Sequence, residues 1–191
     1  MLKIVRIAGS ALGCCLLAAA TLAHAQAPAA AKPAVGTVMT PAATYGKLLG
    51  MLSKEFVDAA EAMPEDKFDF APTTGEFKGV RSFGAQVKHV AEANWYFFGG
   101  AVSEADSKAK HDAIEKLASK ADIVQALKDS LTQANTYVDG ITAENAFVMT
   151  ANGTRGGMAS FGIAHMMDHY GQLAVYLRMN GIVPPASRGQ M

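Results

Sequence analysis

Cysteine is scarce in this chain: its only two cysteines, Cys14 and Cys15, stand side by side near the N-terminus. Both lie within residues 1–25, which have the pattern of a cleavable leader. Removal of 25 of the 191 residues would leave 166 residues beginning at Gln26, without any thiol. That chain could form no disulfide, so its stability must come from a core, and about 150 residues suffice for one domain.

Positive charge does not exceed negative charge, with 17 basic and 17 acidic residues, and it is not gathered in any stripe or arginine cluster. The leader contains Lys3 and Arg6, so cleavage would leave 15 of the 17 basic residues against 17 acidic ones, a formal charge of −2. A surface that collects phosphates needs clustered Lys and Arg. The sequence therefore predicts no nucleic-acid partner.

The N-terminal segment predicts export. Lys3 and Arg6 precede an apolar run at residues 7–23, and Ala23-His24-Ala25 fits a small-x-small cleavage signal. We expect a signal peptide over 1–25, a periplasmic or secreted protein, and no stable membrane insertion after cleavage. A retained membrane anchor is the alternative, but the run is Ala-rich, short for spanning, and followed by no stop-transfer charges.

The remaining chain predicts an all-α domain. Residues 26–40 are rich in Ala and Pro and are expected to form a flexible lead-in, followed by a four-helix bundle over residues 41–187. Strand alternation is weak, with hints only near Phe68 and Phe147. The expected elements are a helix from the Thr40 cap to Met63, an ordered loop at 64–81, a helix from the Ser82 cap to Gly99-Gly100, a short helix at 113–117, a helix from the Ser119 cap past Val138, and a helix at 159–180.

Three histidines form the strongest candidate site. His165 and His169 stand four residues apart, a step of about 40° around a helix, so both imidazoles share one face with apolar residues. His89 lies on the apolar side of another predicted helix. Buried imidazoles need partners for their nitrogens, and a metal ion shared by the three would supply one. The alternative is that each histidine bonds a carbonyl or a neighbouring side chain.

The ligand set indicates the chemistry only coarsely. Three nitrogen ligands leave a coordination position open to water, which distinguishes a catalytic site from a closed structural one. Imidazoles suit zinc, nickel, iron or copper, so the sequence predicts a divalent metal without selecting one. Bound zinc lowers the pKa of water or of a thiol towards neutrality and so produces a nucleophile.

Several polar residues lie close to these histidines in sequence. Glu92 follows His89 by one helical turn, Asp168 adjoins His169, and the hydroxyls of Tyr96 and Tyr170 are near. Each is a candidate for orienting a ligand or for catalysis, and each has a plainer interpretation as a solvated charge or a packing residue. A further histidine, in the charged segment KAKHDAIEK, is expected to be solvated and unrelated to the site.

Two segments resemble the DinB/YfiT-like family: residues 68–97 and residues 161–187. The specific part is the His-x-x-x-His-Tyr-Gly-Gln-Leu run at 165–173. The resemblance implies an up-down-down-up helical bundle in which one histidine of the second helix and two of the last, here His89, His165 and His169, hold the metal. Relatives in the wider superfamily use bacillithiol, mycothiol or glutathione, and homodimers are frequent among them.

Together these observations predict an exported, metal-dependent transferase or hydrolase that acts on a small molecule and is free to form a homodimer. The alternative is a non-catalytic metal-binding or stress-associated bundle, in which the ion stabilises helix packing. A helical interaction module without metal is a third hypothesis.

Overall fold

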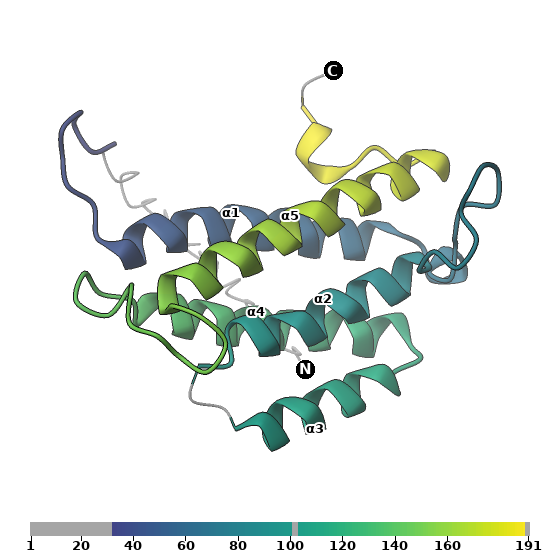
Figure 1. Cartoon of the computed structure of the whole chain (residues 1–191). Coiled ribbons are helices and arrows are strands. Elements are labelled where there is room, and N and C mark those ends of the chain that lie inside the picture. The colour runs from purple at the N-terminus through teal and green to yellow at the C-terminus, as the bar shows by residue number, and fades with distance from the viewer. Residues whose placement is uncertain (1–31, 101–102, 190–191) are drawn as a thin grey trace, which may run out of the picture. The chain divides into compact units, whose positions relative to one another are not determined.

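The computed structural model describes residues 32–100 and 103–189, and helices account for its regular structure (Figure 1). No strand forms in this part of the chain, where the only bridge is between Met149 and Thr154, so the predicted all-α class is confirmed. The helices are α1 (Pro41–Ala62), α2 (Phe83–Phe97), α3 (Glu104–Glu115), α4 (Lys120–Asp139) and α5 (Arg155–Met179), with short 3-10 helices η1 (Glu65–Lys67) and η2 (Pro185–Ser187).

The chain divides into two units, residues 1–37 and 38–191. Of the first unit the structure describes residues 32–37, which contain a turn closed by a hydrogen bond from Thr37 N to Ala34 O (3.1 Å). The predicted leader and residues 26–31 of the predicted lead-in lie outside the described residues. None of the helices in the described ranges is long and apolar enough to cross a membrane.

A hydroxyl side chain caps the N-terminus of every α-helix described. The predicted caps Thr40, Ser82 and Ser119 are confirmed, because each accepts a hydrogen bond from the backbone N–H three residues later. Ser103 and Thr154 do the same for α3 and α5.

Two predicted boundaries were wrong. The short helix expected at 113–117 is a twelve-residue helix that begins at Glu104, and the last helix begins at Arg155 instead of 159. In α5, Gly156 and Gly157 lie inside the first turn. Gly156 is needed for close packing, since a Cβ there would lie 3.0 Å from both Ala146 O and the Tyr45 hydroxyl.

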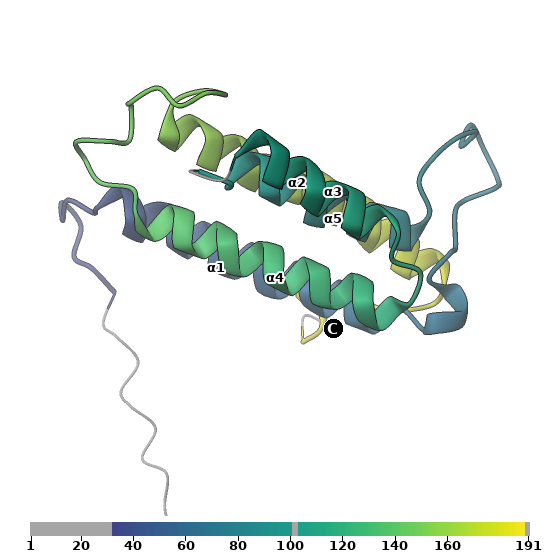
Figure 2. The same ribbon diagram turned by 90° about the horizontal axis from the view of Figure 1, so that it is seen from below.

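The four long helices enclose the core: α1 packs against α4 and α5, and α2 packs against the same two helices (Figure 2). The largest fully buried side chains include Phe56, Phe83, Phe98, Leu127, Met166, Leu173 and Leu177. The third helix, α3, packs on α2 and buries Ile114. This arrangement places the middle of α2 beside the middle of α5, where the predicted site lies.

The loop between α1 and α2 fixes the start of α2. Phe68 O and Phe70 O accept hydrogen bonds from the first two backbone N–H groups of α2, at 2.7 and 2.8 Å. The Phe68 ring meets Phe83 edge-on at 5.4 Å, and Phe70 meets Tyr176 of α5 edge-on at 5.8 Å. The expectation of an ordered loop held by its phenylalanines is therefore confirmed.

Candidate metal site

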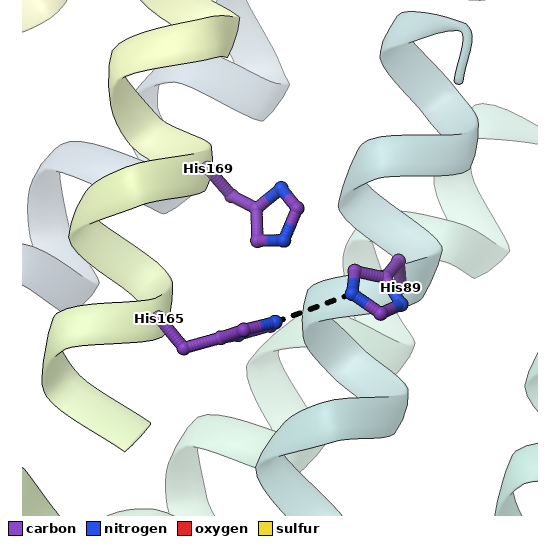
Figure 3. A group of neighbouring side chains, drawn as sticks. All are labelled: His89, His165 and His169. Atoms are coloured by element: carbon purple, nitrogen blue, oxygen red, sulfur yellow. Dashed lines mark hydrogen bonds between the residues drawn. The ribbon is translucent and has the colours of Figure 1, made fainter. Parts of the chain in front are cut away.

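His89 extends from α2 towards α5, and His165 and His169 extend from successive turns of α5 towards α2 (Figure 3). The ring centroids are 5.1 Å apart for His89 and His165, 4.8 Å for His89 and His169, and 4.5 Å for His165 and His169. The three residues that the sequence singled out thus form one cluster, although His89 is 76 residues from His165 in sequence.

The nitrogen atoms of the cluster converge. Each of the three side chains offers one ligand atom, and these atoms all lie within 4.8 Å of one another. His165 Nε2 and His89 Nε2 are 3.2 Å apart. Two imidazole nitrogens bound to one tetrahedral zinc ion at about 2.05 Å would be roughly 3.3 Å apart. The spacing of His89 and His165 therefore fits two ligands of one metal ion, and His169 lies close enough to be the third.

Burial keeps the imidazoles neutral. His169 is 6% exposed, and His89 and His165 are partly buried. Burial is the largest cause that lowers the pKa of His89 and of His169 to about 4, and it lowers the pKa of His165 as well. The positive charge of Arg81 acts in the same direction on all three, whereas Asp168 opposes the shift at His165 and His169. At neutral pH the rings therefore have lone pairs available to a metal.

A chain of side-chain amides supports His169. His169 Nδ1 lies 2.6 Å from Gln86 Oε1, and Gln86 Nε2 donates to Gln172 Oε1 at 2.6 Å. Gln172 Nε2 in turn donates to Asp168 Oδ2 at 3.1 Å. His165 has no such support in the described residues, because its Nδ1 is buried without a hydrogen-bond partner.

Gln86 is the site residue that the sequence analysis missed. It is 1% exposed and makes the only hydrogen bond from the cluster to another residue in the described ranges. The available signal was a polar amide one helical turn before His89, on the apolar face of the same helix. Asp168, a candidate for orienting a ligand or a solvated charge, accepts a hydrogen bond from Gln172 in the structure.

The other polar candidates point elsewhere. Burial raises the pKa of Tyr170, and the charges of Glu55 and Asp58 of α1 act in the same direction. This side chain therefore lies on the α1 side of α5. Tyr96 is 54% exposed and stacks edge-on against Phe97.

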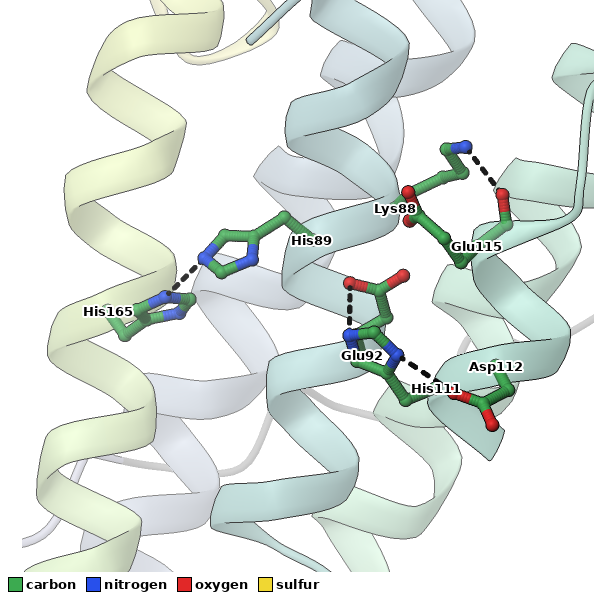
Figure 4. Close-up of polar contacts among 7 residues, drawn as sticks. All are labelled: Lys88, His89, Glu92, His111, Asp112, Glu115 and His165. Atoms are coloured by element: carbon green, nitrogen blue, oxygen red, sulfur yellow. Dashed lines mark hydrogen bonds and ion pairs between the residues drawn. The ribbon is translucent and has the colours of Figure 1, made fainter. Parts of the chain in front are cut away.

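Glu92 faces α3 (Figure 4). Its Oε2 lies 3.5 Å from His111 Nε2, and His111 Nδ1 lies 3.6 Å from Asp112 Oδ1. His111 was expected to be solvated; its side chain is 56% exposed, and it also contacts the buried Glu92. Burial, followed by the nearby Glu115 carboxyl, raises the pKa of Glu92 to about 7.

A cavity of about 590 Å³ lies between α2 and α3, and residues 150–152 are also part of its lining. Glu92 and Trp95 of α2, His111 of α3 and Tyr137 of α4 contribute to its walls. None of the three clustered histidines is among the described residues that line it. The cavity therefore adjoins the face of α2 that meets α3.

The fold and the site define a class: an all-helical protein with three convergent imidazoles between two of its helices. Residues 49–173 match the model of the DinB superfamily, a range that contains all three histidines. The chain belongs to this superfamily, so the resemblance seen in the sequence is confirmed. A comparison with curated proteins finds no match.

Proposed function

We propose that His89, His165 and His169 hold one divalent metal ion and that the chain is a metal-dependent transferase or hydrolase acting on a small molecule. The observation that supports this most strongly is the convergence of the three ligand atoms within 4.8 Å. With three protein ligands a position remains open, and a bound ion would there lower the pKa of water or of a substrate nucleophile.

The chain's own residues would contribute in three ways. Partial burial keeps the imidazoles neutral, so that they do not repel a cation. The Phe97 ring lies 5.2 Å from the His165 ring and restricts that ligand from one side. Gln86 holds His169 through its Nδ1. An up-down-down-up arrangement of the four long helices, export through the leader at 1–25 and a homodimer belong to the same proposal.

Elemental analysis of the mature protein, obtained through its native export route, tests the metal site. We expect close to one ion per chain in the wild type and almost none in His165→Ala. His111→Ala is the matched control, because His111 lies on α3 outside the cluster and its loss should leave the metal content unchanged. Retention of the metal by His165→Ala would reject the site.

A non-catalytic metal-binding bundle is the second candidate. The observation that favours it is the cavity of about 590 Å³, whose described lining includes none of the three histidines. Turnover on a panel of thiol-conjugation and ester substrates separates the two functions. Metal-dependent turnover that disappears in His165→Ala supports the enzyme, whereas a metal that only raises the melting temperature supports the second candidate.

A further inference from the structure

Four polar side chains connect the surface of α5 to the histidine cluster. Asp168 is exposed, Gln172 is partly buried, Gln86 is 1% exposed and His169 is 6% exposed. Successive members are joined at 3.1, 2.6 and 2.6 Å. Since Gln86 comes from α2 and the other three from α5, this series of hydrogen bonds also joins the two helices that form the site.

The direction of these hydrogen bonds is fixed from the surface inwards. A carboxylate only accepts hydrogen bonds, so Gln172 must direct its NH₂ group towards Asp168 and its oxygen towards Gln86. Gln86 must then direct its own NH₂ group towards Gln172, which leaves its oxygen facing His169. Reversing either amide would place two oxygens or two NH₂ groups at hydrogen-bonding distance, so the network permits one orientation of each.

The last link decides the tautomer of His169. An oxygen acceptor 2.6 Å from Nδ1 requires a proton on Nδ1, and a neutral imidazole then has its lone pair on Nε2. Figure 3 shows the other ring nitrogen of His169 directed towards His89 and His165. The lone pair therefore points into the cluster.

We propose that Asp168, Gln172 and Gln86 are positioning residues that hold His169 in its Nδ1-protonated tautomer, so that Nε2 is ready to bind before the metal arrives. We call the hydrogen-bonded series Asp168, Gln172 and Gln86 the relay. The biological role of this relay depends on the proposed metal site, but the tautomer of His169 does not. His169 is the pre-organised ligand, whereas His165, whose Nδ1 has no partner, and His89 contact each other through their Nε2 atoms at 3.2 Å and have no supporting amide among the described residues.

Gln86 is the essential link because it is buried. Replacing it by Met keeps the length of the side chain and removes the acceptor, which leaves the Nδ1 proton of His169 without a partner in a buried site. The ring would then transfer its proton to Nε2, the tautomer that an unconstrained histidine side chain favours, and block its own ligand atom. Asp168→Asn leaves a group that both donates and accepts, so the relay loses its fixed direction while every side chain still has a partner.

Long-range ¹H–¹⁵N NMR of the histidine rings in the metal-free mature protein tests the tautomer directly. We expect His169 to be protonated at Nδ1 in the wild type, shifted towards Nε2 in Gln86→Met, and a mixture of tautomers in Asp168→Asn. Gln86→Glu keeps the acceptor and should retain Nδ1 protonation. Gln133→Met is the matched control, because Gln133 of α4 donates to Phe98 O, at the C-cap of α2 and outside the cluster.

Titration with Zn²⁺ measures the consequence for binding. We expect a loss of affinity of roughly 10- to 100-fold in Gln86→Met, a smaller loss in Asp168→Asn and none in Gln133→Met. Protonation of His169 at Nε2 in the wild type, or an unchanged tautomer in Asp168→Asn, would overturn the proposal. Asp168 is exposed, so we expect Asp168→Asn to fold normally. An Nδ1-protonated His169 in a protein that binds no Zn²⁺ would leave the relay intact and reject the proposed metal site instead.

Discussion

Glu92 of α2 and His111 of α3 face each other, with Glu92 Oε2 3.5 Å from His111 Nε2. The Glu92 side chain is 8% exposed, and its Oε1 is buried without a hydrogen-bond partner within the described chain. The charged groups that act on it are Glu115, His111 and Lys88. Because α3 buries little apolar surface, polar contacts such as this one and the hydrogen bond from Lys88 Nζ to Glu115 O at 3.0 Å help to attach α3 to α2.

The pKa of Glu92, raised from 4.5 to about 7 mainly by burial, makes stability depend on pH. A folded-state pKa above the unfolded value means that the folded protein binds this proton more tightly. The stabilisation is complete below pH 4.5 and is lost as the pH rises through 7. We expect the free energy of unfolding of the wild type to fall by on the order of 2 kcal/mol over this range relative to Glu92→Gln.

Urea denaturation of both proteins at several pH values between 4 and 8 provides the measurement. The difference between the two curves isolates Glu92, since both proteins contain the same histidines, whose lowered pKa values act in the opposite direction. Parallel curves would show that the Glu92 carboxyl has an ordinary pKa.

Gly162 sets the distance between α5 and the end of α2, one turn before His165. A Cβ at this position would lie 2.5 Å from Phe98 Cζ and 3.0 Å from Phe97 Cβ. We expect Gly162→Ala to reduce the free energy of unfolding by about 1–3 kcal/mol, because both rings lie in a packed interior.

Gly171 on the same helix is the matched control. A Cβ there meets nothing within 4 Å, so Gly171→Ala should stabilise the helix by roughly 0.5–1 kcal/mol. Thermal unfolding of the two variants gives the comparison, and equal effects at the two glycines would contradict the close contact at Gly162.

Local sequence signals predicted much of this fold. Thr40, Ser82 and Ser119 mark helix starts by a hydroxyl that caps a nearby N–H, an interaction that spans only three residues. The pair His165 and His169 could likewise be placed on one face by helical geometry alone.

Other features depend on partners that are distant in sequence. The pairing of Gln86 with Gln172 joins residues 86 positions apart, and no periodicity within one helix could show it. The length of α3 was missed because half of its residues are charged and, among those whose burial is described, only Ile114 is buried. The start of α5 was placed too late because the close contact of Gly156 with Ala146 and Tyr45, which requires a glycine inside the helix, is visible only in three dimensions.

Lys120 connects the start of α4 to the end of α1. Its Nζ donates to Glu61 O at 2.8 Å and to Met63 O at 2.6 Å, carbonyls at the C-terminal end of α1 that have no partner within their own helix. A cation there also complements the helix dipole. We expect Lys120→Met to lower the free energy of unfolding by about 1–2 kcal/mol, as measured by urea denaturation. Lys116→Met, at an exposed position, should change it by less than about 0.5 kcal/mol.

A metal ion shared by α2 and α5 should stabilise the folded chain by mass action. A ligand at 100 times its dissociation constant contributes about 2.7 kcal/mol if it binds only the folded state. For a domain of this size that corresponds to a rise in melting temperature of roughly 5–10 °C. We expect this rise when Zn²⁺ is added to chelator-treated protein, and we expect its reversal by the chelator.

The histidine variants show whether the stabilisation arises at the cluster. His169→Ala should abolish the Zn²⁺-dependent rise, because two remaining imidazoles hold the ion far more weakly than three, and His111→Ala should retain it. A rise of equal size in His169→Ala would place the stabilising ion elsewhere on the protein. Since the ion joins a ligand on α2 to ligands on α5, amide hydrogen exchange should slow most in the turns around His89 and His165, where separation of the two helices would break the coordination.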